Sequence, residues 1–401
     1  MRVVYDALGM DPGASSEFLN SWTIASAMAE KYPVTVITPM ECAERFPAVT
    51  PFDVVPVRYG LQGLPLNGGI EYTYRVYSEH VSAAIAGVWT PDTVVHRLNP
   101  CAIRYGSPYA ALFDKTVIGP VGRSTYAPGF PKRPLDWIAE GIKVTDNVRL
   151  SMRRSLLRRT YEDVSAILVS TNAARESLPR SVWPKCVLQP DGVDTGRFVA
   201  SPISRADVVT ILFVGRLIPC KGLRYLLRAL GEECRDLRWR LIVAGDGMER
   251  RSMERLVAEL GIQDRVEFTG WVTSGRMQEL YSACTFCCFP SINESTGNAN
   301  LEAMASGRAV IAADWAGPRE VVGREAGLLV SVAEPEKYHL RLAEALRRLI
   351  EDFDMCERLG DAGRRLVERR NDWPVVLGNL EAVYKRLWDR EPHSRSGGVA
   401  L

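Results

Sequence analysis

The sequence has few of the residues that metal sites, disulfide frameworks and membrane spans require. Its four histidines are too dispersed to form a histidine metal site. Its nine cysteines are scattered without paired Cys-x-x-Cys sets, so they predict neither a zinc site nor a disulfide framework and fit a reducing cytoplasm. No apolar run approaches the length of a bilayer span, and the N-terminus is too short and too polar for a signal peptide.

Charge of one sign is not in excess either. Lys and Arg number 50 and Asp and Glu 48, which leaves a formal net charge of +2 and no electrostatic basis for a nucleic-acid partner. An apolar content of 46% with 24% charged residues is typical of a folded globular protein. At 401 residues the chain is long enough for two domains.

Three short motifs are absent or out of place. No Gly-x-Gly-x-x-Gly follows the first strand and no Walker lysine loop occurs, so the signatures of dinucleotide oxidoreductases and NTPases are missing. One Asp-x-Asp occurs, Asp352 to Asp354, but no strand precedes it and it lies between two helical patterns. We interpret it as a solvated helix boundary, and we expect neither a metal nor another cofactor.

What is present is a strand, a glycine-containing loop and a helix, repeated along the chain. The first instance begins at residue 2 and has a small-residue loop with Gly13 and Ala14; a second series begins at residue 209, after a polar linker. This repetition predicts an α/β fold of two Rossmann-like domains, 1–199 and 200–372, facing one another across a cleft. Between these landmarks, the sequence predicts irregular structure over 51–79, one helix over 149–161 and a disordered tail over 394–401.

The most informative stretch runs from Pro290 to Gly307. It follows an apolar strand, carries Glu294 in a turn, and opens a helix after Gly297 that ends at Gly307. At the carboxyl edge of a parallel sheet, such a helix start offers free backbone N–H groups and a positive dipole end, and Glu302 lies one turn in. This combination suits an anion joined to polyols, such as a nucleoside diphosphate sugar.

Each carboxylate has a competing interpretation. Glu302 accepts hydrogen bonds from the ribose hydroxyls in our hypothesis, and the alternative is a favourable charge near a helix N-terminus. Glu294 holds sugar hydroxyls in the same hypothesis. The two could also be the acid and base of a glycosidase, which we disfavour because nothing fixes their separation across a sugar ring.

Two cations and one histidine complete the candidates. Arg216 and Lys221 lie in a strand-to-helix loop beside Gly215, where they could offset the charge that grows on a departing diphosphate; the alternative is ordinary surface cations. His96 ends a short strand, and a structural role is its alternative. The arginines of 149–159 fit a solvated helix face better than a surface for anionic lipid.

Together these elements resemble the family-four retaining glycosyltransferases of the GT-B fold, over nearly the whole chain. FVGRLIPCKGLRYLLRAL (213–230) looks like the diphosphate loop, PSINESTGNANLEAMASG (290–307) like the Glu-x7-Glu motif, and NDWPVVLGNLEAVYKRLW (371–388) like the terminal helix. The resemblance implies that 373–390 completes an N-terminal acceptor-binding domain and that 200–372 binds the nucleotide sugar.

The resemblance also implies roles for single residues. His96, Arg216, Lys221 and Glu294 would be catalytic, and Gly122 and Arg123 would lie on the acceptor side. The donor-binding residues would be Gly13, Ala14, Gly215, Arg216, Lys221, Gly270, Trp271, Val272, Glu294, Gly297, Asn298, Ala299, Asn300, Leu301 and Glu302. Two places depart from the family pattern: Arg123 stands where a further glycine is usual, and Ser295-Thr296 replaces Gly-Phe after Glu294.

The implied reaction is retaining, metal-independent glycosyl transfer from a UDP- or GDP-linked sugar. We expect a soluble small-molecule acceptor, as in bacterial natural-product biosynthesis, and a cytoplasmic monomer or homodimer, with membrane contact left open. The alternatives are a lipid-linked or polysaccharide-assembly glycosyltransferase at the membrane surface, a nucleotide-sugar epimerase or hydrolase, and a non-catalytic sugar-nucleotide-binding protein.

Overall fold

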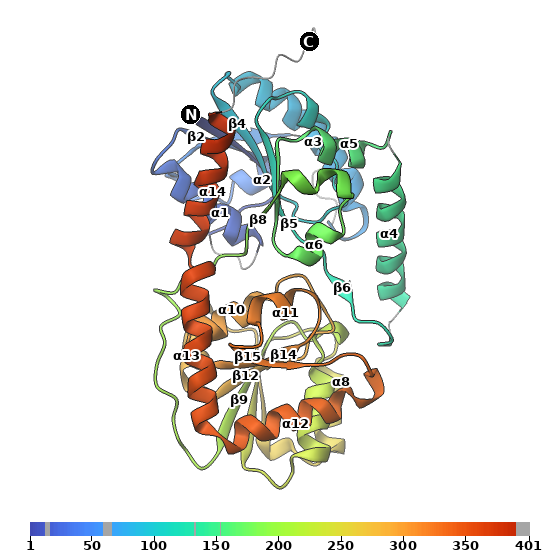
Figure 1. Cartoon of the computed structure of the whole chain (residues 1–401), viewed down its shortest axis with the longest axis vertical. Coiled ribbons are helices and arrows are strands. Elements are labelled where there is room, and N and C mark those ends of the chain that lie inside the picture. The colour runs from blue at the N-terminus through green and yellow to red at the C-terminus, as the bar shows by residue number, and fades with distance from the viewer. Residues whose placement is uncertain (13–16, 59–65, 132–133, 153, 390–401) are drawn as a thin grey trace. The chain divides into compact units, whose positions relative to one another are not determined.

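The computed structural model describes residues 1–12, 17–58, 66–131, 134–152 and 154–389 (Figure 1). The chain forms two compact units, which we describe separately. Unit 1 comprises residues 1–123, 132–190 and 376–401, and unit 2 comprises residues 124–131 and 191–375. The chain thus passes between the units near Pro190, near Val375 and on both sides of the segment 124–131. The predicted tail at 394–401, Gly13 and Ala14 lie outside the described residues.

Unit 1 is built on a seven-stranded parallel sheet in the order β3-β2-β1-β4-β5-β7-β8. Its strands are β1 (Arg2–Ala7), β2 (Val34–Pro39), β3 (Asp53–Val57), β4 (Thr93–Asn99), β5 (Thr116–Val121), β7 (Ala166–Val169) and β8 (Cys186–Leu188). Its helices are α1 (Glu17–Ala29), α2 (Met40–Ala43), α3 (Leu66–Val88), α4 (Pro134–Ser151), α5 (Leu156–Asp163), α6 (Asn172–Glu176) and most of α14 (Trp373–Trp388).

Two local predictions for unit 1 were wrong. Residues 51–79 are not irregular, because they contain β3 and most of α3. β3 is an edge strand, where Pro56 is tolerated, and α3 buries Tyr77, Val81 and Ile85, spaced four apart on one helix face. The arginine-rich helix is also two helices: α4 ends at Ser151, and the Ser155 hydroxyl caps α5 by accepting from the Arg158 N–H at 3.2 Å.

Unit 2 contains a six-stranded parallel sheet in the order β11-β10-β9-β12-β14-β15, the order of a doubly wound Rossmann fold. Its strands are β9 (Val209–Val214), β10 (Trp239–Ala244), β11 (Val266–Gly270), β12 (Phe286–Phe289), β14 (Ala309–Ala313) and β15 (Gly327–Val330). Its helices are α7 (Leu223–Arg228), α8 (Arg250–Glu259), α9 (Ser274–Ala283), α10 (Asn298–Ala305), α11 (Ala316–Val322), α12 (Tyr338–Glu351) and α13 (Phe353–Arg370). Asp352 caps α13 by accepting from the Met355 N–H at 2.7 Å, as a helix boundary should.

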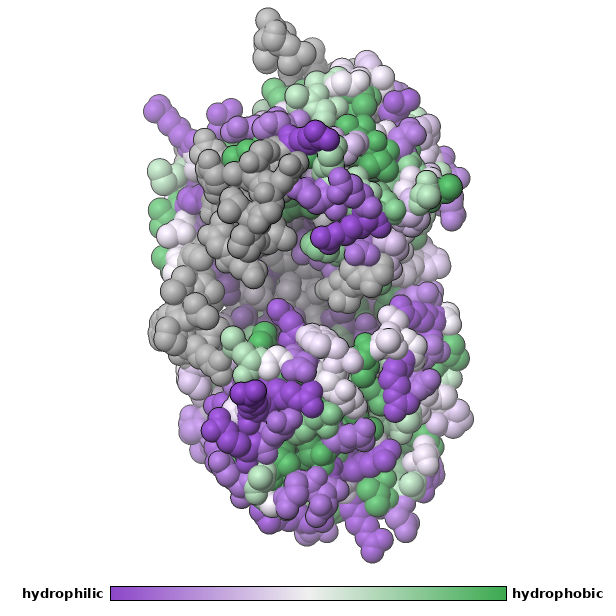
Figure 2. All heavy atoms as spheres, turned by 180° about the vertical axis from the view of Figure 1, so that it is seen from behind, coloured by the Kyte–Doolittle hydropathy of each residue, from purple (hydrophilic) through white to green (hydrophobic). Residues whose placement is uncertain are grey.

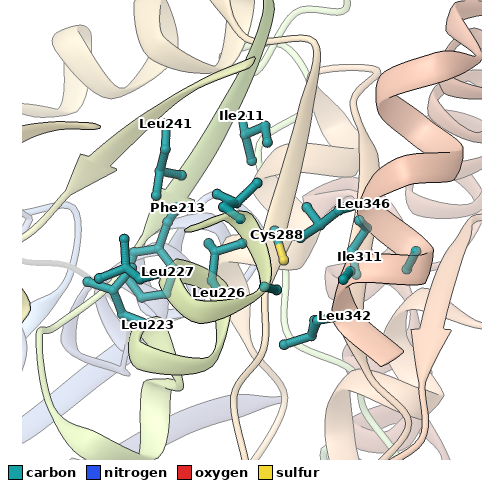
Figure 3. Packing of buried hydrophobic residues seen from close by; sticks show 14 of the residues in the cluster. Ile211, Phe213, Leu223, Leu226, Leu227, Leu241, Cys288, Ile311, Leu342 and Leu346 are labelled. Atoms are coloured by element: carbon teal, nitrogen blue, oxygen red, sulfur yellow. The ribbon is translucent and has the colours of Figure 1, made fainter. Parts of the chain in front are cut away.

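The two faces of this sheet are covered by different helices. Because side chains alternate along a strand, Ile211 and Phe213 of β9 point to the face that α7 and α12 cover, where they meet Leu226 and Leu346 (Figure 3). Leu212 points to the opposite face, which α9, α10 and α13 cover. Hydrophilic residues predominate on the surface that Figure 2 shows, with hydrophobic residues in separate groups among them. None of the helices in the described ranges has the length and apolarity that a membrane span needs.

Helix α14 is attached to unit 1 by a chain of buried hydrogen bonds. His96 Nε2 lies 2.7 Å from the Gly119 carbonyl oxygen, which can only accept, so the proton is on Nε2. Nδ1, 2.5 Å from the Tyr384 hydroxyl, therefore accepts from it, and Tyr384 in turn accepts from the Tyr5 hydroxyl at 3.1 Å. All three side chains are fully buried, and burial lowers the pKa of His96 to about 3.

This buried neutral histidine predicts a pH dependence of stability. In the unfolded chain a histidine has a pKa of about 6.5, so below that pH the unfolded state binds a proton that the folded state excludes. His96 should therefore lower the free energy of unfolding by about 1.4 kcal/mol for each pH unit below about 6.5. Urea unfolding at about pH 7 and about pH 5 should show a steeper loss for the wild type than for His96→Gln, by about 2 kcal/mol. Parallel pH profiles of the two proteins would contradict this assignment.

Candidate active site

The predicted site residues of unit 2 gather where the strand order reverses, between β9 and β12. The loop after β9 carries Arg216 and Lys221, and the loop after β12 carries Glu294. A Cβ atom on Gly222 would lie 2.1 Å from the Pro290 carbonyl oxygen, so only glycine lets the two loops approach this closely. The Ile292 N–H then donates to the Cys220 carbonyl at 2.8 Å. Ligands of open α/β sheets bind at such a switch point.

Lys221 and Glu294 form an ion pair between these two loops. The Lys221 ammonium donates to Oε2 of Glu294, and the side chains retain 21% and 19% of their exposure. Both groups are thus held at the sheet edge and remain accessible to a ligand. The guanidinium of Arg216, in contrast, is exposed, and it makes no ion pair with the described residues.

Helix α10 provides the second carboxylate. Gly297 and Asn298 open the helix, and the Asn300 side chain donates to the Gly297 carbonyl at 3.0 Å, which fixes this first turn. Glu302 is half-buried in the next turn and accepts from the Tyr281 hydroxyl at 3.0 Å. Burial raises the pKa of Glu302, while the Tyr281 hydrogen bond and the charge of Arg197 act in the opposite direction.

A short strand from the first half of the chain borders Glu294, and the sequence did not predict it. β6 (Thr125–Tyr126) pairs antiparallel with β13 (Asn293–Glu294), which places Thr125 opposite Glu294. Trp315 donates to the Thr125 carbonyl at 2.9 Å, and Phe130 packs edge-on against Tyr225 and Tyr338 in the unit 2 core. A two-residue strand has too little hydrophobic pattern to be read from sequence.

Parts of this chain are similar in sequence to known glycosyltransferases. Residues 208–352 match the family model described as Glycosyl transferases group 1. The domain formed by residues 208–352 belongs to the group 1 glycosyltransferases. A lipopolysaccharide core biosynthesis glycosyltransferase of Rhizobium meliloti is 34% identical over 197 residues, which are 48% of this chain and 54% of that protein. A phosphatidyl-myo-inositol mannosyltransferase of Mycobacterium tuberculosis is 31% identical over 254 residues, 61% of this chain and 65% of that protein. The chain therefore spans less than two thirds of these curated relatives.

A solved structure confirms the predicted fold class. Sucrose-phosphate synthase from Thermosynechococcus elongatus superposes with a TM-score of 0.73 at 20% identity and covers 97% of this chain and 99% of that one. Both sheets of the present chain are parallel and Rossmann-like, so the α/β GT-B fold predicted from the sequence is the observed one.

In the group 1 domain, the predicted residues Gly270, Trp271 and Val272 lie at the same edge of the sheet as the cations. β11 ends at Gly270, and the Gly270 carbonyl accepts from the Gly245 N–H at 2.9 Å. Trp271 follows and its side chain is exposed. Within the described residues, no three His, Cys, Asp or Glu side chains come together as a metal site would require.

The remaining predicted residues belong to unit 1. Gly122 and Arg123 follow β5, and Arg123 donates to the Asn147 side chain at 2.9 Å. His96 is fully buried with both ring nitrogens bonded to protein groups, which favours its structural alternative over a contact with a sugar. Asn99 is the residue that sequence reasoning missed here: its amide exchanges hydrogen bonds with the backbone of Gly9, at 3.0 and 2.6 Å, and so anchors the loop after β1.

Ser295 and Thr296, the two residues that depart from the family pattern after Glu294, are tightly held in the group 1 domain. Thr296 donates to Oδ2 of Asp191 at 2.5 Å, a bond that the usual phenylalanine could not make. A Cβ atom on Gly317 would lie 1.6 Å from the Ser295 carbonyl oxygen, so α11 packs directly against this turn.

This contact predicts a strong effect of Gly317→Ala. The added methyl must displace the Ser295–Thr296 turn, and overpacking of this kind typically costs about 1–3 kcal/mol. The melting temperature should fall, and nucleoside diphosphate binding should weaken with it. Gly275→Ala in α9 is the matched control, because a Cβ atom there meets nothing within 4 Å. Equal melting temperatures of the two variants would show that the turn has room.

Proposed function

We propose that the protein is a glycosyltransferase that uses a nucleoside diphosphate sugar as donor. The Lys221–Glu294 ion pair at the switch point carries this proposal. In this proposal Lys221 would bind a phosphate of the donor and Glu294 would bind its sugar. The ion pair holds these two side chains in contact, as the diphosphate and the sugar of one donor molecule are joined. Arg216 lies in the same loop as Lys221, and Glu302 lies one turn into α10 for the ribose.

Charge stabilisation is the main task of these residues. Lys221, Arg216 and the N–H groups at the start of α10 would stabilise the negative charge that develops on the leaving diphosphate. We expect this arrangement to need no metal ion. Glu294 would orient the sugar through its hydroxyls, so that the acceptor attacks from the face that the diphosphate leaves and the leaving phosphate takes the proton, with retention.

An epimerase, a hydrolase and a non-catalytic binding protein would use the same edge of the sheet. The first two would consume donor without an acceptor, which product analysis in the absence of acceptor reveals. A binding protein would show no turnover at all.

Two substitutions test the proposed donor site. Lys221→Ala and Glu294→Ala should each lower the rate of sugar transfer at least about tenfold, or about 1.4 kcal/mol, with unchanged melting temperatures. The donor is first chosen by thermal shift among UDP-, GDP- and dTDP-sugars, since a bound donor raises the melting temperature. Lys337→Ala is the control, because Lys337 is an exposed lysine whose ion-pair partner among the described residues is the nearby Glu334. Wild-type rates in both site variants would refute the donor site, and loss of activity on adding EDTA would refute metal independence.

A specific surface feature favours an acceptor at a membrane over a soluble one. Val144, Val148 and Met152 follow one another at four-residue spacing along and just beyond α4, and they are 61%, 53% and 55% exposed. The opposite side of the helix buries Asp146 and Leu150. Within residues 143–152, the outward side of α4 (Figure 1) thus carries an apolar stripe beside the exposed polar residues Thr145, Asn147 and Ser151.

Charge around this apolar stripe suits an anionic lipid surface. Arg154 and Arg159 are exposed beyond its C-terminal end. Interfacial helices bind such surfaces through an apolar face flanked by basic residues. Two relatives are named for a phosphatidyl-myo-inositol and a lipopolysaccharide core substrate, which agrees with a lipid-linked acceptor. The soluble acceptor expected from sequence stays a prediction.

Vesicle binding distinguishes the two kinds of acceptor site. The wild type should sediment with vesicles of phosphatidylglycerol and phosphatidylcholine, less so at high salt, because screening weakens the arginine contribution. The double variant Val144→Ser/Val148→Ser should bind at least about fivefold less. Val49→Ser is the control, since Val49 is an isolated exposed valine in unit 1. A wild type that stays in the supernatant would support the soluble acceptor.

A further inference from the structure

A buried tyrosine lies behind the proposed ribose-binding carboxylate. Tyr281, in the last turn of α9, is fully buried, and its hydroxyl is 3.0 Å from Oε2 of Glu302 and 3.4 Å from the Ala299 carbonyl oxygen. A phenol has one proton, and the carboxylate is both the nearer and the charged acceptor. The Tyr281 hydroxyl therefore donates to Glu302.

The Tyr281 side chain is itself held rigidly from two sides. Its ring packs edge-on against Phe198, with ring centres 5.8 Å apart. Its carbonyl oxygen accepts from Nε of Arg308 at 2.7 Å, and Arg308 is a fully buried residue that also donates to the Ser282 carbonyl at 3.0 Å. Because these contacts fix both the ring and the end of α9, the hydroxyl occupies one position.

A carboxylate that binds a ribose needs a fixed orientation. Both ribose hydroxyls donate hydrogen bonds. The carboxylate must therefore present its free lone pairs in one plane to receive them. The hydrogen bond from Tyr281 occupies one lone pair of Oε2 of Glu302 and leaves Oε1 for the ligand. A charge-assisted bond of this kind is about twice as strong as a neutral one.

We propose that Tyr281 is a positioning residue for nucleotide binding: its hydroxyl holds the Glu302 carboxylate in the orientation that receives the ribose hydroxyls. This inference rests on the proposed function, in which Glu302 contacts the ribose. The competing role is purely structural, in which the hydroxyl merely satisfies a buried polar group.

Another tyrosine of the same unit separates these roles. Tyr338 is also fully buried in unit 2, and its hydroxyl has no hydrogen-bond partner among the described residues. Burial of a tyrosine in this unit therefore does not require an acceptor. Tyr338→Phe is the matched control for Tyr281→Phe, because each substitution removes one buried hydroxyl and preserves the ring.

The experiment measures affinity for UDP and GDP, each beside its 2′-deoxy counterpart, by titration calorimetry. For the ribonucleotide that the wild type binds, Tyr281→Phe should raise Kd at least about fivefold, as loss of a hydrogen bond to a charged group does. The 2′-deoxy counterpart, which lacks one of the two ribose donors, should lose at most about twofold. Tyr338→Phe should leave both affinities within about twofold of the wild type. If Tyr281→Phe does not fold, Tyr281→Met carries the same expectation.

Glu302→Gln separates this inference from the function on which it rests. If Glu302→Gln binds the ribonucleotide as the wild type does, the proposed donor site fails. If Glu302→Gln weakens binding and Tyr281→Phe does not, the role of Tyr281 alone is refuted. An equal loss for the ribose and 2′-deoxy ligands in Tyr281→Phe would also overturn it, as a structural role predicts. In the Glu302→Gln background, Tyr281→Phe should add less than about twofold, since the two residues act as one unit.

Discussion

The close approach of two loops at the carboxyl edge of the unit 2 sheet is the constraint on which the site depends. β9 and β12 are neighbours in the sheet, although the strands β10 and β11 and the helices α7, α8 and α9 lie between them in the sequence. Gly222 lets the first loop touch Pro290, and backbone hydrogen bonding at Cys220 and Ile292 keeps the contact. The ion pair between Lys221 and Glu294 follows from this backbone geometry. Because a charge-assisted hydrogen bond is stronger than a neutral one, the pair also restrains both side chains.

Behind this edge, buried polar groups also support the site. The Tyr281 hydroxyl donates to Glu302, and the Tyr281 carbonyl oxygen near the end of α9 accepts from Arg308. Thr296 donates to Asp191, which begins the longer segment of unit 2. Buried polar groups are costly unless they are hydrogen-bonded, so each of these contacts restricts the conformations open to the loops. A donor with several hydroxyls needs such a prearranged set of partners.

In unit 1, buried polar residues hold a helix and a loop in place. His96, in the middle of β4, connects Gly119 with Tyr384 and so ties the last helix of the chain to the sheet. The neighbouring Asn99 anchors the loop at Gly9. These two polar residues thus attach α14 and the loop after β1, and the apolar stripe of Val144, Val148 and Met152 provides the surface on which we base the acceptor proposal.

The sequence alone determined the fold class, the repeated strand–loop–helix pattern and the candidates Arg216, Lys221, Glu294 and Glu302, but it missed the edge strand β3. Parallel strands and helices leave strong apolar periodicities and glycine punctuation, and these can be read locally. Only the tertiary structure decided that Lys221 contacts Glu294, that Thr125 lies beside Glu294, that Tyr281 donates to Glu302 and that His96 is fully bonded inside the protein. Each of these depends on groups distant in the chain meeting at a few ångströms, and no local pattern of residues specifies such a contact.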